Sequence, residues 1–408
     1  MNETRNQAER ARKAFLRLSS SPHRTDVLEG IAAALDARRA DILAANKTDL
    51  EQAKEVLSPP LYKRLLLNPS KLDDVIEGVR QVAAKPDPVG RVLEETELDA
   101  GLVLRKVQTP IGVIAMIFES RPDAAPQIAS LAIRTGNAVV LKGGREAENT
   151  NAALVRIIRD VLATYDLVDA VQMVSTRDEV GALLEMDDLI DLVIPRGSNE
   201  MVRSIQGRTR IPVLGHADGI CHVYIDEAAD PDKAIRIAVD SKAQYPAVCN
   251  AAETLLVHRN FKHRDKVLDA LREAGVELRI ENDFGHEFLD LIMAVRMVDS
   301  VQEAIDHIHR YGSKHTDTIV TETAATAQKF LTEVDSAGVF WNASTRFADG
   351  FRYGFGAEVG ISTNKTHARG PVGMEGLLIY KYQLIGDGHI AATYSGENAR
   401  KFTHRRLS

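Results

Sequence analysis

The chain has 408 residues, enough for two or three domains, since length over roughly 150 residues is a useful first measure of domain number. Its 51 Lys and Arg against 58 Asp and Glu give a formal net charge of −7, which excludes a strongly basic nucleic-acid coat and a global attraction to anionic membranes. With 44% hydrophobic and 27% charged residues, the composition is typical of a globular protein with a sizeable core.

Three sequence features predict a soluble cytoplasmic protein. Cys221 and Cys249 are the two cysteines and neither lies in a CxxC pair, so no disulfide framework and no CxxC zinc site is expected. Residues 1–10 are polar and lack the apolar region of a signal peptide. The longest apolar run, Ile111 to Phe118, is far shorter than the ~20 residues that a membrane span needs.

The first 80 residues predict helices. Asp26 followed by Glu29 resembles a capping box, and apolar residues between 28 and 35 recur at helical spacing. From Val89 to Lys106 the pattern changes to short alternating segments around a turn, which predicts an extended hairpin.

From Pro110 onward, short apolar runs alternate with longer amphipathic ones. The predicted strands are Ile111–Phe118, Ala138–Lys142, Val171–Val174, Ile190–Ile194, His222–Asp226, Thr254–His258, Ile292–Val298 and Leu377–Gly386. The predicted helices are Asp123–Arg134, Ala147–Tyr165, Arg177–Met186, Ser198–Gln206, Asp232–Lys242, His263–Ala274 and Val301–Arg310. Such alternation is typical of crossover units that build parallel sheets, so we expect two α/β domains plus a small extended element.

One segment has the residue types of a phosphate-binding turn. Neither GxGxxG nor GxxxxGK[ST] occurs, but Lys142-Gly143-Gly144-Arg145 follows a predicted strand. The glycines would let the backbone approach a ligand, and the two cations could meet a phosphate. The alternative is an ordinary strand-ending turn with solvated charges.

Cys249 is the candidate nucleophile because it lies in a loop between a predicted helix and a predicted strand, where a thiolate can meet backbone donors. The alternative is a buried cysteine that acts as a small hydrophobic residue, and Cys221 fits that alternative better. His307, His309 and His315, on or just after one helix, are interpreted as surface or helix-end histidines. No metal site is predicted.

Taken together, the segments resemble the aldehyde dehydrogenase superfamily and, within it, the gamma-glutamyl phosphate reductases, also called glutamate-5-semialdehyde dehydrogenases. The resemblance covers essentially the whole chain. The segments that carry it are Arg64–Leu67, Pro86–Gly90, Thr109–Val113, Phe118–Pro122, Thr135–Asn137, Leu141–Gly144, Val298–Ile319, His367–Gly373 and Leu377–Tyr382. The most specific of them contains Tyr311-Gly-Ser-Lys-His-Thr-Asp317.

The resemblance implies an aldehyde dehydrogenase-like α/β fold and NADPH-dependent reduction of L-glutamyl 5-phosphate to L-glutamate 5-semialdehyde, the second step of proline biosynthesis from glutamate. Cys249 falls on the family's nucleophile and would form a thioester. The implied cofactor-binding residues are Lys142, Gly143, Gly144, Arg145, Gly197, Ser198 and Glu287.

The sequence departs from ordinary aldehyde dehydrogenases at two positions. His216 aligns with the general-base glutamate, and without that base we expect no water to be activated against the thioester. A hydrolytic NAD(P)-dependent aldehyde dehydrogenase is the alternative, and it requires the missing base. Ser120 stands at the oxyanion asparagine, so we expect the backbone amide of Cys249 or Asn250, with the Ser120 hydroxyl, to stabilise the oxyanion.

Arg121 and Arg369 lie in family-like segments and are hypotheses for contacts to the substrate anions, with structural ion pairing as the alternative for each. The implied domains are a cofactor domain over 1–225, a catalytic domain over 226–375 and a C-terminal strand and tail over 376–408. The hairpin at 93–107 and that strand would form the oligomerisation element of a homo-oligomer. Functional coupling to glutamate 5-kinase is expected because acyl phosphates are labile, and the basic tail Arg400–Arg406 is interpreted as solvated rather than as a nucleic-acid site.

Overall fold

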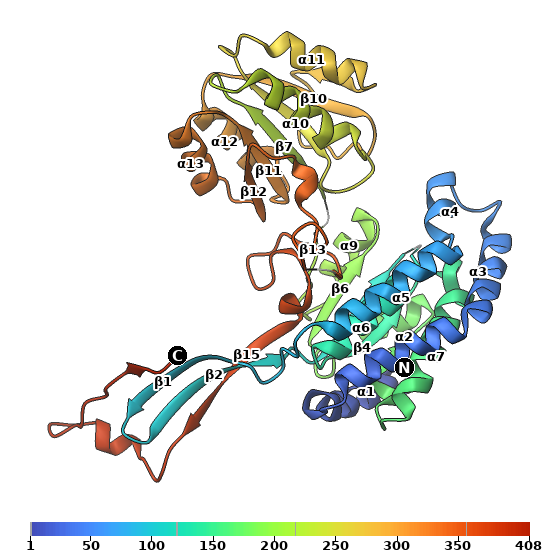
Figure 1. Cartoon of the computed structure of the whole chain (residues 1–408), viewed down its shortest axis with the longest axis vertical. Helices are drawn as coiled ribbons and strands as arrows, with labels where there is room; N and C mark the ends of the chain where they lie inside the picture. Colours follow the sequence, from blue (N-terminus) through green and yellow to red (C-terminus); the bar gives the residue numbers. More distant parts are fainter. Residues whose placement is uncertain (1, 120, 217, 356) are drawn as a thin grey trace. The chain divides into compact units, whose positions relative to one another are not determined.

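The computed structural model describes residues 2–119, 121–216, 218–355 and 357–408, and the chain forms two compact units (Figure 1). Unit 1 comprises Met1–Arg196, Arg208–Val213 and Gly373–Ser408, and unit 2 comprises Gly197–Gly207 and Leu214–Val372. The predicted α/β fold is confirmed, because each unit contains a parallel sheet with helices.

Unit 1 begins with helices, as the periodicity predicts. They are α1 (Asn2–Ser20), α2 (Arg24–Ala37), α3 (Arg39–Ala53), α4 (Pro59–Leu65) and α5 (Pro69–Ala84). The expected capping box at Asp26 is wrong: α2 starts earlier, His23 precedes it without a side-chain cap, and Asp26 lies inside the first turn. There the Asp26 carboxylate contacts Nδ1 of His23 at 3.0 Å. The carboxylate that was expected to cap the helix is therefore engaged by His23.

The parallel sheet of unit 1 has the strand order β5-β4-β3-β6. Its strands are β3 (Val113–Phe118), β4 (Ala138–Lys142), β5 (Val171–Met173) and β6 (Leu192–Arg196), and its helices are α6 (Ala124–Arg134), α7 (Glu148–Ala163) and α8 (Arg177–Leu183). The predictions are confirmed within about one turn at each boundary. Because the order reverses direction at β3, the carboxyl ends of these strands are where such sheets bind ligands.

A four-stranded antiparallel sheet extends unit 1, in the order β15-β2-β1-β16. The predicted hairpin forms β1 (Val92–Asp99) and β2 (Leu102–Pro110), and β15 (Leu378–Ile385) pairs with β2 over its whole length. The short β16 (Arg405–Arg406) pairs with β1. The strand β15 is an edge strand with exposed large apolar side chains, a surface that is suited to pairing with another chain.

Unit 2 contains a six-stranded parallel sheet in the order β12-β11-β7-β8-β10-β9. Its strands are β7 (Cys221–Ile225), β8 (Ala252–His258), β9 (Glu277–Ile280), β10 (Ile292–Val298), β11 (Thr316–Val320) and β12 (Gly338–Trp341). Its helices are α9 (Asn199–Gln206), α10 (Pro231–Ala243), α11 (Arg264–Glu273), α12 (Val301–Tyr311) and α13 (Ala324–Glu333), and a short ladder joins β13 (Ile361–Ser362) to β14 (Gly370–Pro371).

The boundary between the units differs from the expected one at residue 225. The strand β7 pairs with β8 and β11, so it belongs to the sheet of unit 2, and the main boundary lies between Val213 and Leu214. The sequence pattern of β7 resembles that of the strands before it, and strand pairing is what assigns it to the second sheet. Among the described residues, no helix combines the length and the apolar character needed to cross a bilayer.

Candidate active site

Three side chains from distant parts of the sequence meet beside the sheet of unit 2. His216 lies before β7, Cys249 before β8 and His315 directly before β11, and these three strands are neighbours in the order β11-β7-β8. Because the strands are parallel, their amino ends lie at one edge of the sheet. One ligand-type atom of each residue lies within 4.8 Å of the others.

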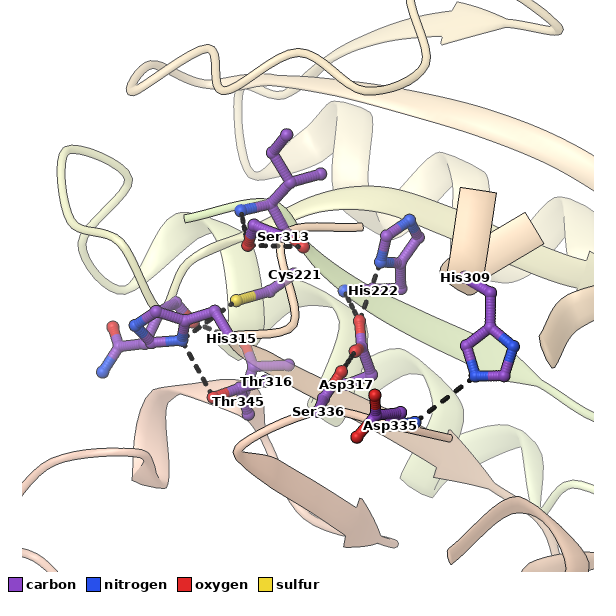
Figure 2. A network of polar contacts seen from close by, with 12 residues as sticks. Cys221, His222, His309, Ser313, His315, Thr316, Asp317, Asp335, Ser336 and Thr345 are labelled. Atoms are coloured by element: carbon purple, nitrogen blue, oxygen red, sulfur yellow. Dashed lines mark hydrogen bonds and ion pairs between the residues drawn. The ribbon is translucent and has the colours of Figure 1, made fainter. Parts of the chain in front are cut away.

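Each imidazole is oriented by a contact at its Nδ1. Nδ1 of His216 lies 2.8 Å from the carbonyl oxygen of Ile361, which leaves Nε2 to face the thiol. Nδ1 of His315 lies 3.0 Å from Thr316 Oγ1 and 3.6 Å from Cys221 Sγ (Figure 2). His315 is fully buried, and it acts on the Cys249 thiol together with His216. The two rings are edge-to-face, with centroids 4.9 Å apart.

The electrostatics of this cluster favour a thiolate and an imidazolium. Burial by itself raises the pKa of the Cys249 thiol. His315 and His216 lower that pKa by more than burial raises it, so it lies well below the ordinary thiol value. Burial lowers the pKa of His216, but the Cys249 thiolate outweighs burial and raises that pKa to about 9. The cluster therefore favours a Cys249 thiolate beside a protonated His216, the state in which a cysteine is a nucleophile.

The turn that carries Cys249 is held by contacts to its neighbours. Cys221 Sγ donates to the Cys249 carbonyl oxygen at 3.3 Å, so the buried Cys221 supports the turn. Asn250, 5% exposed, donates from Nδ2 to the Ala348 carbonyl oxygen at 2.9 Å, and its own carbonyl oxygen accepts from Thr345 Oγ1 at 2.7 Å. A Cβ at Gly219 would lie 2.3 Å from the Cys249 carbonyl oxygen, so this approach requires glycine.

A buried network joins β7 and β11 below the cluster. His222 donates from its backbone N–H to Asp317 Oδ1 at 2.9 Å, and its Nδ1 lies 2.7 Å from the same oxygen (Figure 2). Ser336 Oγ donates to the other oxygen of Asp317. Both members of the His222–Asp317 pair are fully buried, so the network fixes the two strands that present His216 and His315.

Glu287 lies within electrostatic reach of the cluster, in unit 2. It accepts from Asn199 Nδ2 at 2.6 Å and from the backbone N–H of Gly219. Burial raises the pKa of Glu287, and the Cys249 thiolate adds to that rise. Ser198 caps α9, as the predicted Gly197-Ser198 helix start requires, because its Oγ accepts from Met201 N–H at 3.4 Å.

The other candidate cofactor residues lie in unit 1, where Lys142 ends β4 and the next residues line a pocket. The lining residues are Gly143, Gly144, Arg145, Glu148, Asn151, Met173, Val174 and Ser175. A Cβ at Gly143 would lie 2.0 Å from Asn151 Nδ2. Asn151 is 2% exposed, and neither polar atom of its amide has a partner among the described residues. Close glycine backbone, adjacent cations and an unsatisfied amide fit a nucleotide, and Asn151 is a lining residue that sequence reasoning missed.

The predicted contacts of Arg121 and Arg369 with the substrate stay predictions, and one predicted residue lies outside the described part of the chain. Arg369 donates to the carboxylate and to the carbonyl oxygen of Asp335, at 3.1 and 3.0 Å, which is the structural ion pairing weighed as the alternative. Arg121 lies in unit 1 and also has a partner. Ser120 lies outside the described residues.

The interpretation of the histidines as surface or helix-end residues is wrong for two of the three. His315 is fully buried in the cluster, and His307 is 2% exposed and accepts from Arg296 at Nδ1, whereas His309 is exposed. His216, Cys249 and His315 also offer two nitrogens and one sulfur, donor types that Zn²⁺ takes, although no metal site is predicted from the sequence. The position of His315 in the family-specific segment Tyr311–Asp317 is the sequence feature that points to it. The helical pattern before this segment does not show that the chain turns back and buries His315.

Comparison with known proteins defines the class of this site. The model of the aldehyde dehydrogenase family matches residues 1–289, more than half of the chain. The chain therefore belongs to the aldehyde dehydrogenase family, oxidoreductases that act on aldehyde groups with a nicotinamide cofactor.

Its relatives within that family share one name. The gamma-glutamyl phosphate reductase of Nostoc punctiforme is 52% identical in an alignment 421 positions long, which covers 98% of this chain and 97% of that protein. The one of Synechococcus sp. strain WH7803 is 53% identical over 411 residues, with 96% and 94% covered. The crystal structure of gamma-glutamyl phosphate reductase from Thermotoga maritima is similar with a TM-score of 0.93 at 37% identity, covering 95% of this chain and 99% of that chain. The resemblance to the gamma-glutamyl phosphate reductases is thereby confirmed.

Proposed function

We propose that this protein reduces L-glutamyl 5-phosphate to L-glutamate 5-semialdehyde and releases phosphate, with NADPH as reductant, as the second step of proline biosynthesis from glutamate. The observation that carries the proposal is the Cys249 thiolate held beside His216 and His315. It occurs in a chain that is 52% identical to a gamma-glutamyl phosphate reductase, in an alignment that covers 98% of the chain.

In the first half-reaction, Cys249 Sγ attacks the acyl carbon of the substrate. The carbon–sulfur bond forms, the bond from that carbon to the phosphoryl oxygen breaks, and phosphate leaves. Protonated His216 faces the sulfur and supplies the proton that the departing phosphate takes up. The backbone amides of Cys249 and Asn250 have no acceptor within the described residues, so they are available to the developing oxyanion. The Ser120 hydroxyl is the proposed additional donor.

In the second half-reaction, the bound cofactor supplies the hydride that converts the thioester into the aldehyde and frees the thiolate. The residues that would hold the cofactor are Lys142, Gly143, Gly144, Arg145, Gly197, Ser198 and Glu287. Lys142 and Arg145 supply the positive charge that a 2′-phosphate requires, which is why NADPH rather than NADH is proposed. The ratio of kcat/KM for NADPH to that for NADH tests this, and Arg145→Ala should lower it.

Hydrolysis of the thioester requires a base that removes a proton from water. His216 stands at the position where a hydrolytic aldehyde dehydrogenase requires a glutamate as base. Without that carboxylate to remove a proton from water, the site favours transfer to the cofactor over attack by water. This argument separates the proposed reductase from a hydrolytic NAD(P)-dependent aldehyde dehydrogenase.

The reverse reaction tests the proposal. Glutamate 5-semialdehyde and NADP are mixed with the enzyme, and the absorbance of the reduced nicotinamide is followed with and without inorganic phosphate. We expect reduction that requires phosphate and that disappears in Cys249→Ala. Equal rates without phosphate would show that water is the acceptor and would favour the hydrolytic alternative. No absorbance change with any combination would indicate a non-catalytic protein on this fold.

Three further proposals concern the setting of the enzyme. We propose a homo-oligomer that pairs through the edge strand β15, where Ile379, Tyr380 and Tyr382 are exposed. Light scattering of wild type and of Tyr382→Asp tests this proposal.

The labile acyl phosphate favours functional coupling to glutamate 5-kinase, which co-purification of the two enzymes would test. Cytoplasmic placement is proposed because a reactive thiolate persists in a reducing compartment, and localisation of a tagged protein would test it.

A further inference from the structure

A segment that sequence reasoning did not single out, residues 344–352, is attached directly to the nucleophile turn. Thr345 Oγ1 donates to the carbonyl oxygen of Asn250, and Asn250 Nδ2 donates to the carbonyl oxygen of Ala348. Arg346 lies between these two attachment points. Because Asn250 follows Cys249 in the chain, Arg346 is held close to the reacting sulfur.

Among the described residues, Arg346 forms no ion pair with a carboxylate. The side chain is 8% exposed, and its Nε donates to the neutral Gln244 Oε1 at 3.0 Å. Among the described residues, this is the one side-chain hydrogen bond of Arg346, and no carboxylate lies within 4.0 Å of its guanidinium. The two terminal nitrogens therefore have donors left for an anion that arrives with the substrate.

Arg352 adds a second positive charge at the same place. Its guanidinium donates to the carbonyl oxygen of Arg346, and it also lacks a carboxylate partner in the described part of the chain. Burial lowers the pKa of Arg346 and Arg352 lowers it further, whereas the Cys249 thiolate and the carboxylates of Asp240 and Asp349 raise it. The region therefore combines two adjacent cations with the nucleophile.

We propose that Arg346, assisted by Arg352, forms the binding site for the phosphoryl group of the substrate and for inorganic phosphate in the reverse direction; this rests on the proposed function. The phosphoryl group is attached through one oxygen to the carbon that Cys249 Sγ attacks, so it must lie next to the sulfur. The α-carboxylate of the same substrate lies at the far end of its carbon chain. A planar guanidinium can bind two phosphoryl oxygens at once and can stabilise the charge that grows on the leaving group.

Steady-state kinetics of the reverse reaction test the proposal. In Arg346→Gln, the KM for inorganic phosphate should rise at least about tenfold while the KM for glutamate 5-semialdehyde changes less than about twofold. Arg346→Lys should lie between, because it keeps the charge but loses the planar pair of donors. Arg272→Gln is the matched control, since Arg272 is an exposed arginine of α11 that pairs with Asp269, and it should behave as wild type.

A second readout does not depend on turnover. Inorganic phosphate bound beside Cys249 should slow alkylation of the thiol by iodoacetamide, and the phosphate concentration that gives half protection should rise at least about tenfold in Arg346→Lys. An unchanged KM for phosphate with unchanged protection would overturn the proposal. A selective rise in the KM for the semialdehyde would overturn it in favour of the α-carboxylate. If Arg346→Gln does not fold, Arg352→Gln, expected to show a smaller rise in the KM for phosphate, replaces it. Failure of the proposed function would look different from failure of this inference, because the reverse reaction of the wild-type enzyme would then not require phosphate.

Discussion

Replacing His216 with Gln removes one of the two imidazoles that lower the pKa of Cys249, while Gln keeps a polar group of similar reach. An adjacent opposite charge shifts a pKa by about 1–3 units, so the pKa of Cys249 should rise by about that amount. Removing His315 as well leaves burial unopposed, and the pKa should reach or exceed the ordinary thiol value of about 8.5. At pH 7 a thiol of that pKa is only about 3% thiolate.

The assay is the rate of Cys249 alkylation by iodoacetamide as a function of pH. Because a thiolate becomes intrinsically more nucleophilic as its pKa rises, the rate at one pH is a poor measure and the midpoint of the profile is the observable. We expect a midpoint well below about 8.5 in wild type, one at least about 1 unit higher in His216→Gln, and the highest in the double variant with His315→Gln.

His309→Gln serves as the matched control, since His309 is an exposed histidine of the same unit and should leave the midpoint unchanged. Cys221→Ala confirms which thiol is being alkylated. A wild-type midpoint at or above the ordinary thiol value would refute the reasoning, as would a midpoint that His216→Gln does not move while its thermal unfolding matches wild type.

Three further predictions follow from individual contacts. Gly143→Ala should raise the KM for the nicotinamide cofactor more than tenfold with little change in the KM for glutamate 5-semialdehyde, because the added Cβ would lie 2.0 Å from Asn151 Nδ2. Equal cofactor KM values for the variant and wild type would contradict the assignment of this pocket. Lys242→Met should cost about 3–5 kcal/mol in urea unfolding, since it strands the buried Glu253 carboxylate 2.5 Å from the lost ammonium, and adding Glu253→Leu should recover most of it. Micromolar Zn²⁺ should inhibit reversibly, with EDTA restoring activity, because three donor atoms lie within 4.8 Å; unaltered rates in zinc would exclude such a site.

Local sequence patterns were sufficient for most elements of the fold. The strand Ile292–Val298 was predicted with its observed bounds, and α9 was predicted within one residue, because buried parallel strands are short apolar runs and the helices between them are amphipathic. The capping box at Asp26 failed because a similar pattern also fits the interior of a first helical turn. The assignment of β7 to unit 2 depends on pairing with β8 and β11, which local periodicity does not contain.

The sequence by itself determined the family, through motifs that span the whole chain, and it singled out Cys249 as the candidate nucleophile. Only the tertiary structure decided which groups surround that cysteine. His216, Cys249 and His315 are separated by tens of residues and meet because three adjacent parallel strands place their amino ends at one edge. Likewise, Arg369 and Arg346 look alike as sequence letters, yet one pairs with Asp335 and the other is buried without a carboxylate beside the nucleophile turn. Burial and pairing set what a charged side chain can do, and both are properties of the folded chain rather than of its local sequence.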